Sequence, residues 1–211
     1  MKVIIILFFL LLTSNTYAQK LQCGCNVDSI GSTVEDCKVK FLKNGSSLYY
    51  QYNCDSIWLT LKNSAGKKKI IYSMAGREYK ELANLNYRIG YQFEHEYQKY
   101  LLFRSGCPAN GPCNFVLVSK YTGRTVKELG ELIYDHSTDK FYNFIVQLVS
   151  NGIVLYYPDK HMVRSYKVNT SELNAIIPEY LFDSVNVKND YLILKYSGLH
   201  TERTIKLNLS K

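Results

Sequence analysis

Short apolar runs separated by turn residues form the main pattern along the chain. In the clearest case, mainly apolar residues occupy 144–149 and 153–157, and Asn151-Gly152 stands between them. Asn-Gly between two apolar runs indicates a two-residue hairpin turn, because both turn positions need positive φ. A second turn at Pro158-Asp159 leads into a third run, 162–168. The segment therefore predicts a three-stranded antiparallel meander.

Three other segments show the same succession of runs and turns. The four expected units span residues 47–74, 100–129, 144–168 and 182–207. Their middle strands begin at Ile57, Phe115, Ile153 and Tyr191, so consecutive units are 58, 38 and 38 residues apart. Two equal steps are typical of a repeated β-unit, and the longer first step requires an insertion.

The insertion lies between residues 76 and 99. In it, aromatic and histidine side chains alternate with polar ones from Tyr91 to Gln98, which predicts a strand with one solvated face. Residues 77–85 and 171–177 predict short helices, neither of them long enough to change the fold class.

The fold class follows from these runs and from a composition with 19 tyrosines and only four prolines. Tyrosine favours pleated, half-buried surfaces, so we expect an all-β chain of antiparallel three-stranded meanders. Such meanders, especially with the Lys120–Arg124 turn between a buried strand and an outward-leading one, resemble the blades of β-propellers. The resemblance covers about two thirds of the chain after residue 18, rests on turn placement, and implies a small propeller-like arrangement with closed edges. A β-sandwich or an open barrel is the alternative.

The amino terminus has the profile of a signal peptide. Met1-Lys2 gives a positive start, ten apolar residues follow, and Thr16-Tyr17-Ala18 offers small residues before a cut. A transmembrane helix needs roughly 20 apolar residues, so we expect no stable membrane insertion after cleavage. The sequence predicts a signal peptide over 1–18, a single all-β domain over 19–211, and a secreted or periplasmic location.

Cleavage would leave a basic chain with 25 basic and 18 acidic side chains. Cations recur after the second turn of each unit, and stacked units would gather them along one rim that attracts an anionic partner. The predicted binding residues are Lys68, Arg124, Lys160, Arg164 and Arg203. Alternatively, these cations protect exposed edge strands from aggregation. An exported location argues against nucleic acid as the partner.

Six cysteines follow the predicted cleavage site: Cys23, Cys25, Cys37, Cys54, Cys107 and Cys113. An even number of cysteines in an exported chain indicates a disulfide framework. Cys107 and Cys113 flank a turn-forming loop that would bring them within bonding distance, so we expect them to pair.

Two further bonds are expected in the amino-terminal part of the chain. Cys23 and Cys25 share one face of an extended strand, so their partners should be Cys37 and Cys54. The order is open, with a slight preference for Cys25–Cys37 and Cys23–Cys54.

Catalytic and metal-binding motifs are missing from the sequence. It has no Gly-x-Ser-x-Gly, no His-Glu-x-x-His and no Cys-x-x-Cys pair, and its four histidines are scattered. We therefore expect no catalytic residue, metal or cofactor. The four histidines are His95, His136, His161 and His200.

The leading hypothesis is an exported, non-enzymatic binding protein that holds an acidic protein or an anionic glycan on a tyrosine-rich, basic β-surface. An inhibitor or immunity protein would fit this description. One competing hypothesis is an envelope-directed hydrolase that uses paired carboxylates roughly 5 to 9.5 Å apart. Its candidates are Glu94, Glu96, Asp135 and Asp139, with Glu94 and Glu96 expected to be exposed. The other is a purely structural envelope component.

Overall fold

Four antiparallel sheets make up the computed structural model of the chain. It describes residues 21, 23–24, 37–84, 90–106, 113–135, 137–138, 140–169, 173, 181–197 and 202–210. The predicted signal peptide and the predicted helix over 171–177, apart from Leu173, lie outside these residues.

The first two sheets have four strands each. The first sheet contains β1 (Lys40–Phe41), β2 (Ser47–Tyr52), β3 (Ser56–Lys62) and β4 (Lys68–Ala75), and is followed by the helix α2 (Gly76–Asn84). The second contains β5 (Gln92–Glu96), β6 (Tyr100–Gly106), β7 (Asn114–Ser119) and β8 (Thr125–Gly130). The alternating segment from Tyr91 therefore contains a strand as predicted, and this strand forms the edge of the second sheet.

The last two sheets have three strands each. The third contains β9 (Ile145–Val149), β10 (Gly152–Tyr157) and β11 (Met162–Lys167), with the short 3-10 helix η1 (Pro158–Lys160) between β10 and β11. The fourth contains β12 (Ser184–Lys188), β13 (Tyr191–Ser197) and β14 (Glu202–Asn208). The prediction of an all-β chain of antiparallel meanders is confirmed.

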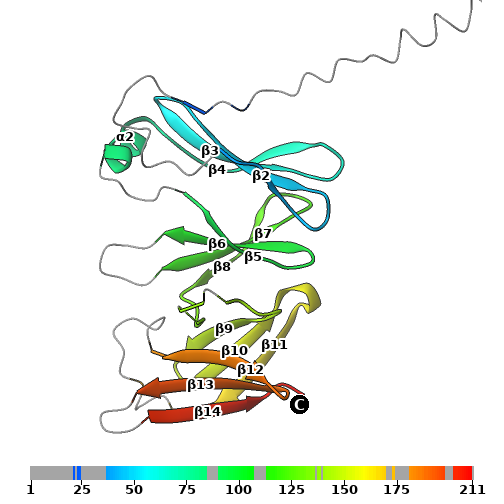
Figure 1. Ribbon diagram of the computed structural model, residues 1–211, viewed down its shortest axis with the longest axis vertical. Helices are drawn as coiled ribbons and strands as arrows, with labels where there is room; N and C mark the ends of the chain where they lie inside the picture. The colour runs from blue at the N-terminus through cyan, green and yellow to red at the C-terminus, as the bar shows by residue number, and fades with distance from the viewer. Residues whose placement is uncertain are drawn as a thin grey trace, which may run out of the picture.

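The sheets stack face to face in chain order, with the first and fourth at opposite ends (Figure 1). An apolar layer fills each gap. Leu101 and Phe103 of β6 point towards the first sheet, whereas Leu102 points towards the third. The third layer joins Leu155 of β10 to Leu194 of β13. Inner strands are thus buried on both faces, which explains their nearly continuous apolar runs.

Two hairpin turns show how the sequence sets strand register. Asn189 and Asp190 have φ values of 49° and 61°, so the β12–β13 turn has the two positive-φ positions of a two-residue hairpin. At the other predicted turn, Asn151 does not have positive φ, and Gly152 is already the first residue of β10. A Cβ on Gly152 would lie 2.0 Å from the Tyr166 carbonyl oxygen, so close approach to β11 requires glycine here.

Contacts between sheets show which turns lie on the same side of the stack. The Asp159 carboxylate accepts hydrogen bonds from the backbone N–H groups of Gln98 (2.9 Å) and Lys99 (2.8 Å). The β10–β11 turn therefore lies beside the β5–β6 turn, at the same end of the second sheet as the β7–β8 turn. These turns all lie on one side of the stack, where the strands end, and we call this side the Asp159 end.

The strands of the fourth sheet run in the opposite direction to the corresponding strands of the other three sheets. Arg164, near the start of β11, donates to the carbonyl of Leu209, and the Tyr166 hydroxyl donates to the carbonyl of Asn208 at 2.6 Å. The end of β14 therefore lies at the Asp159 end, and the β13–β14 connection lies at the other end (Figure 1).

Candidate anion-binding cleft

A cleft of about 480 Å³ lies at the Asp159 end, between the β3–β4 turn and the β7–β8 turn. We call it the basic cleft. Its lining residues are Leu61, Asn63, Lys67, Lys68, Lys69, Tyr121, Thr122, Gly123 and Arg124. Two of the five predicted binding residues, Lys68 and Arg124, thus come together, although they are far apart in the sequence.

Backbone hydrogen bonds fix the β3–β4 wall of the cleft. The Asn63 side-chain oxygen accepts a hydrogen bond from the Lys67 N–H at 2.8 Å, and the Asn63 N–H donates to the Lys67 carbonyl at 2.9 Å. The Gly66 N–H closes the turn on the Asn63 carbonyl at 2.8 Å. Lys67 is therefore presented from a defined backbone position.

The β7–β8 wall is a tight turn around Ser119. Its carbonyl accepts the Gly123 N–H at 2.8 Å, its N–H donates to the Arg124 carbonyl at 3.0 Å, and its hydroxyl accepts the Thr122 N–H at 3.2 Å. Gly123 has a φ of +60°, and a Cβ there would lie 3.0 Å from side-chain atoms of both Lys69 and Ile71. Glycine therefore lets this turn pack against β4.

The cleft carries an excess of positive charge. Lys67, Lys68, Lys69 and Arg124 are exposed, and the lining includes no carboxylate. Within the described part of the chain, Lys67, Lys69 and Arg124 have no acidic partner. Several uncompensated cations around one concave surface produce a positive potential that attracts anions. Tyr121, whose side chain is 64 % exposed, and Thr122 add hydroxyl donors at the rim.

A buried ion pair supports the cleft from beneath. Lys120 begins the β7–β8 turn, and its side chain is 1 % exposed and lies 2.5 Å from the Glu96 carboxylate. Glu96 also accepts the backbone N–H of Lys43 at 2.8 Å, which ties the β1–β2 turn to the second sheet. Lys120 is neutralised by Glu96, so its charge is not available to a ligand.

The predicted rim residues of the third unit lie at the same end but do not line the cleft. Lys160 is exposed and Arg164 is half-buried, and their cationic groups lie 5.9 Å and 5.6 Å from the centre of the Tyr157 ring. Because Arg164 also donates to the Leu209 carbonyl, it joins the third sheet to the fourth.

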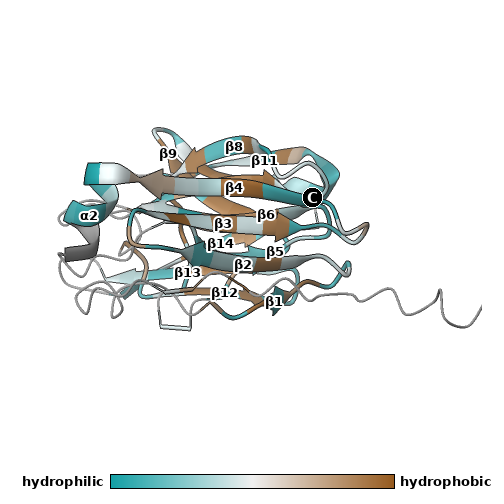
Figure 2. Cartoon of the chain, turned by 90° about the horizontal axis from the view of Figure 1, so that it is seen from above, coloured by the Kyte–Doolittle hydropathy of each residue, from teal (hydrophilic) through white to brown (hydrophobic). Residues whose placement is uncertain are grey.

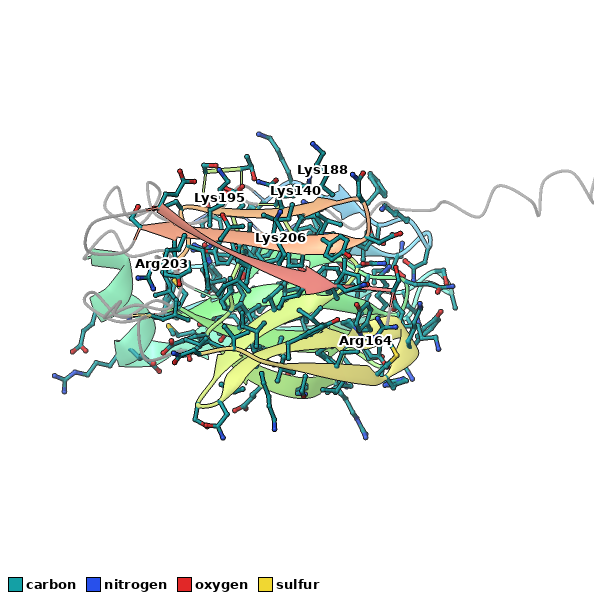
Figure 3. All side chains as sticks on the ribbon, turned by 90° about the horizontal axis from the view of Figure 1, so that it is seen from below. Lys140, Arg164, Lys188, Lys195, Arg203 and Lys206 are labelled. Carbon is teal, nitrogen blue, oxygen red and sulfur yellow. A yellow bond between two sulfur atoms is a disulfide. The ribbon has the colours of Figure 1, made fainter. Side chains whose placement is uncertain are left out.

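Arg203 lies on the side of the stack opposite the Asp159 end, away from Arg164, as Figure 3 shows. The expectation that the cations of all four units share one side is therefore wrong for the fourth unit. The physical reason is the reversed sense of the fourth sheet, which carries the β13–β14 connection away from the Asp159 end.

Eight of the sixteen tyrosines that the structure describes are buried rather than exposed on the surface. The buried ones are Tyr49, Tyr50, Tyr79, Tyr97, Tyr100, Tyr134, Tyr157 and Tyr196. Tyr121, which sequence reasoning treated only as part of a turn, is exposed in the cleft. The position of Tyr121 in the predicted Lys120–Arg124 turn is the sequence feature that could have indicated its exposure.

Cys23 and Cys37 form a disulfide bond. The slight preference for Cys25–Cys37 with Cys23–Cys54 was therefore wrong, since an extended segment can present either cysteine to Cys37. Cys54 and Cys113 are disulfide-bonded as well. Cys25 and Cys107 lie outside the described residues, and the Cys107–Cys113 bond stays a prediction.

The candidate catalytic carboxylates Glu94 and Glu96 are not exposed as expected. Their side chains are only 11 % and 12 % exposed, because Glu94 pairs with Arg104 at 2.9 Å and Glu96 pairs with Lys120. Each carboxylate is thus held by a cation of its own, and neither is open to a substrate. This arrangement therefore does not favour the hydrolase hypothesis.

The other candidate acid and histidine positions give no catalytic arrangement either. Asp135 is buried, and its carboxylate accepts hydrogen bonds from the Ser137 N–H and hydroxyl at 3.0 and 2.6 Å. His161 is exposed, and its ring contacts the Tyr100 hydroxyl at 3.1 Å. His136, Asp139 and His200 lie outside the described residues.

His95 is half-buried between sheets, with its ring 4.7 Å from the Tyr97 ring. Burial lowers the pKa of His95 below 6.5, and the nearby Lys43 lowers it further, whereas Glu96 and Asp159 partly oppose this shift. The neutral ring is therefore favoured.

Over the described ranges, no group of three or more His, Cys, Asp or Glu side chains could hold a metal ion. No helix in the described part of the chain is long and apolar enough to cross a membrane.

No protein-family model and no curated protein matches the sequence. Among solved structures, the chain is similar to one described as the crystal structure of the eukaryotic initiation factor, with 14 % sequence identity and a TM-score of 0.39. The similarity covers 82 % of this chain and 42 % of that chain, so this chain spans less than half of its length. This TM-score is too low to support an inference, so the cleft is interpreted from its own residues.

Proposed function

We propose that the protein is an exported, non-enzymatic binding protein that holds an acidic protein or an anionic glycan in the basic cleft. The observation that carries this proposal is the convergence of Lys67, Lys68, Lys69 and Arg124 from two sheets around one cavity without a lining carboxylate. Cations that only protect edge strands need no such convergence.

Export is supported by the amino-terminal sequence and by the disulfide chemistry. The apolar run before Thr13 has the length of the apolar core of a signal peptide, and Cys23–Cys37 is a bond typical of an oxidising compartment. An acidic partner there would meet a cleft that accelerates its association and orients its carboxylates.

The proposal is tested with a cleft variant, K67S/K68S/R124S, and a control variant of equal charge loss, K140S/K188S/K206S. The control residues are exposed and lie elsewhere on the molecule (Figure 3). Poly-L-glutamate and polygalacturonate serve as anionic probes, and binding is measured by fluorescence anisotropy.

The cleft variant should bind the better of the two probes at least tenfold more weakly than the parent, and the control should bind it within about twofold, because a local cluster acts more strongly than net charge. Both variants should melt at nearly the parent temperature, since exposed cations contribute little to stability. Equal weakening in both variants, or no binding of either probe by the parent, would refute the proposed function.

A further inference from the structure

A second concave surface lies on the outer face of the first sheet, at the end of the stack seen in Figure 2. It has a volume of about 530 Å³ and crosses all four strands, from Phe41 of β1 through Tyr49 and Trp58 to Ile70 of β4. We call it the Trp58 groove. Leu21 and Val39 complete its apolar lining.

The two end faces of the stack differ in chemistry. In the Trp58 groove, Phe41, Ile70 and Val39 are 81 %, 56 % and 39 % exposed. On the outer face of the fourth sheet, Lys188, Lys195 and Lys206 are exposed (Figure 3). The terminal unit of a stacked protein normally presents a polar outer face to water. Apart from Tyr191, which is 40 % exposed, the fourth sheet does so and the first does not, which is typical of a surface that a partner covers.

The groove is adjacent to the basic cleft. Lys68 and Lys69 line both cavities, and the two cavities lie on either side of the β4 edge. A ligand that places acidic groups in the cleft therefore has apolar surface within reach in the groove.

Charge identifies the kind of occupant. Lys62, Lys68 and Lys69 line the groove, and the whole chain carries a formal net charge of +8. A second copy placed on this face would bring lysines against lysines, whether it used its own groove or the outer face of its fourth sheet, and like charges in contact are unfavourable. An acidic partner is complementary instead.

The polar groups of the groove favour a protein over a glycan. The floor includes Ser47 and Thr60, which are 8 % and 4 % exposed, and Gln51, whose side-chain oxygen already accepts the Trp58 Nε1–H at 3.3 Å. Apart from the three lysines, few polar groups are therefore available for the many hydroxyls of a sugar, whereas apolar side chains would bury against Phe41 and Ile70.

We infer that the anionic partner is an acidic protein segment whose apolar side chains fill the Trp58 groove while its carboxylates occupy the basic cleft. This inference rests on the proposed function, because it assigns the class of partner that the cleft holds.

Trp58 provides a direct readout, because it is the single tryptophan of the chain. The probes are a ten-residue peptide of alternating Glu and Leu, a peptide of equal charge that alternates Glu and Ser, and polygalacturonate. The Glu-Leu peptide should bind at least tenfold more tightly than the Glu-Ser peptide and should change the Trp58 emission. The groove variant F41S/I70S should remove this preference while melting like the parent. A control variant, V126S/V163S, replaces apolar side chains that are 51 % and 54 % exposed elsewhere on the molecule. It should still prefer the Glu-Leu peptide.

Two outcomes would overturn the inference and leave the proposed function standing. One is equal binding of both peptides with unchanged Trp58 emission. The other is tighter binding of polygalacturonate with a change in that emission, which would identify a glycan as the occupant. If no probe binds the parent, the proposed function fails as well.

Discussion

The Lys120 ammonium and the Glu96 carboxylate lie 2.5 Å apart beneath the basic cleft, and the Lys120 side chain is 1 % exposed. A lysine this deeply buried is rare unless it is paired. The pair fixes the start of the β7–β8 turn and, through the bond from Glu96 to the Lys43 N–H, the β1–β2 turn. The charge pair therefore fixes the turn that carries Arg124, whereas Lys67, Lys68 and Lys69 project from the β3–β4 turn.

Removing one member of this pair should be costly. K120M leaves the Glu96 carboxylate, with 12 % side-chain exposure, without its cation, so we expect the free energy of unfolding to fall by about 3 to 5 kcal/mol. The double variant E96Q/K120M should recover part of this loss. The exposed pair Lys195–Glu202 is the control, and K195M should change stability little. Urea unfolding measures all three, and equal effects of K120M and K195M would show that burial does not matter.

The Asp159 carboxylate connects the third sheet to the second through the backbone N–H groups of Gln98 and Lys99. D159N replaces one acceptor oxygen by a donor, so one of these bonds is lost. We expect a destabilisation of about 1.5 kcal/mol, at the low end for hydrogen bonds to charged groups because the site is partly solvated. D190N, in the exposed β12–β13 turn, is the matched control and should be nearly neutral. Identical urea midpoints for both variants would contradict this role of Asp159.

His95 should make stability depend on pH. Burial and Lys43 hold the pKa of His95 in the folded protein below the value of 6.5 of the unfolded chain. As pH falls below that value, the unfolded chain takes up the proton first, so the free energy of unfolding decreases until the pH has passed the folded pKa. Above pH 6.5 this contribution is fully present. H95Q should show a smaller difference in stability between about pH 7.5 and pH 5 than the parent does. An unchanged difference would rule out His95 as the group responsible.

Peptide mapping under non-reducing conditions tests export and the disulfide framework together. The processed chain should begin at Gln19, with fragments that link Cys23 to Cys37 and Cys107 to Cys113. Because Cys23 and Cys37 close a loop with a sequence separation of 14, C23S/C37S should lose about 3 kcal/mol of stability. Recovery of a chain that retains Met1 and contains free thiols would contradict both expectations.

Local turn chemistry explains why the meanders could be predicted. Asn189-Asp190 tolerates positive φ at both positions, and the strands on either side pair directly across this turn, Lys188 with Tyr191. The sense of the fourth sheet could not be predicted in the same way, because the order of turns within a meander is the same whichever way the sheet points in the stack. Arg203 was misplaced for this reason.

Tertiary contacts explain why parts of the site were missed. Lys120 looks like any surface lysine in the sequence, and its burial depends on Glu96, 24 residues earlier. Trp58 was read only as a strand residue, because the groove around it requires Phe41 and Ile70 from other strands. In contrast, Lys68 and Arg124 both follow the second turn of their units, and the structure places both around the basic cleft.

The basic cleft is tested most directly by the rate at which labelled poly-L-glutamate associates with the parent, K67S/K68S/R124S and K140S/K188S/K206S as salt is raised. The Debye length falls from about 8 Å at 0.15 M to about 3 Å at 1 M salt, so association steered by the cleft should slow steeply for the parent and the control. The cleft variant should associate slowly at low salt and depend only weakly on salt. A cleft variant as fast and as salt-sensitive as the parent would show that these cations do not hold the partner.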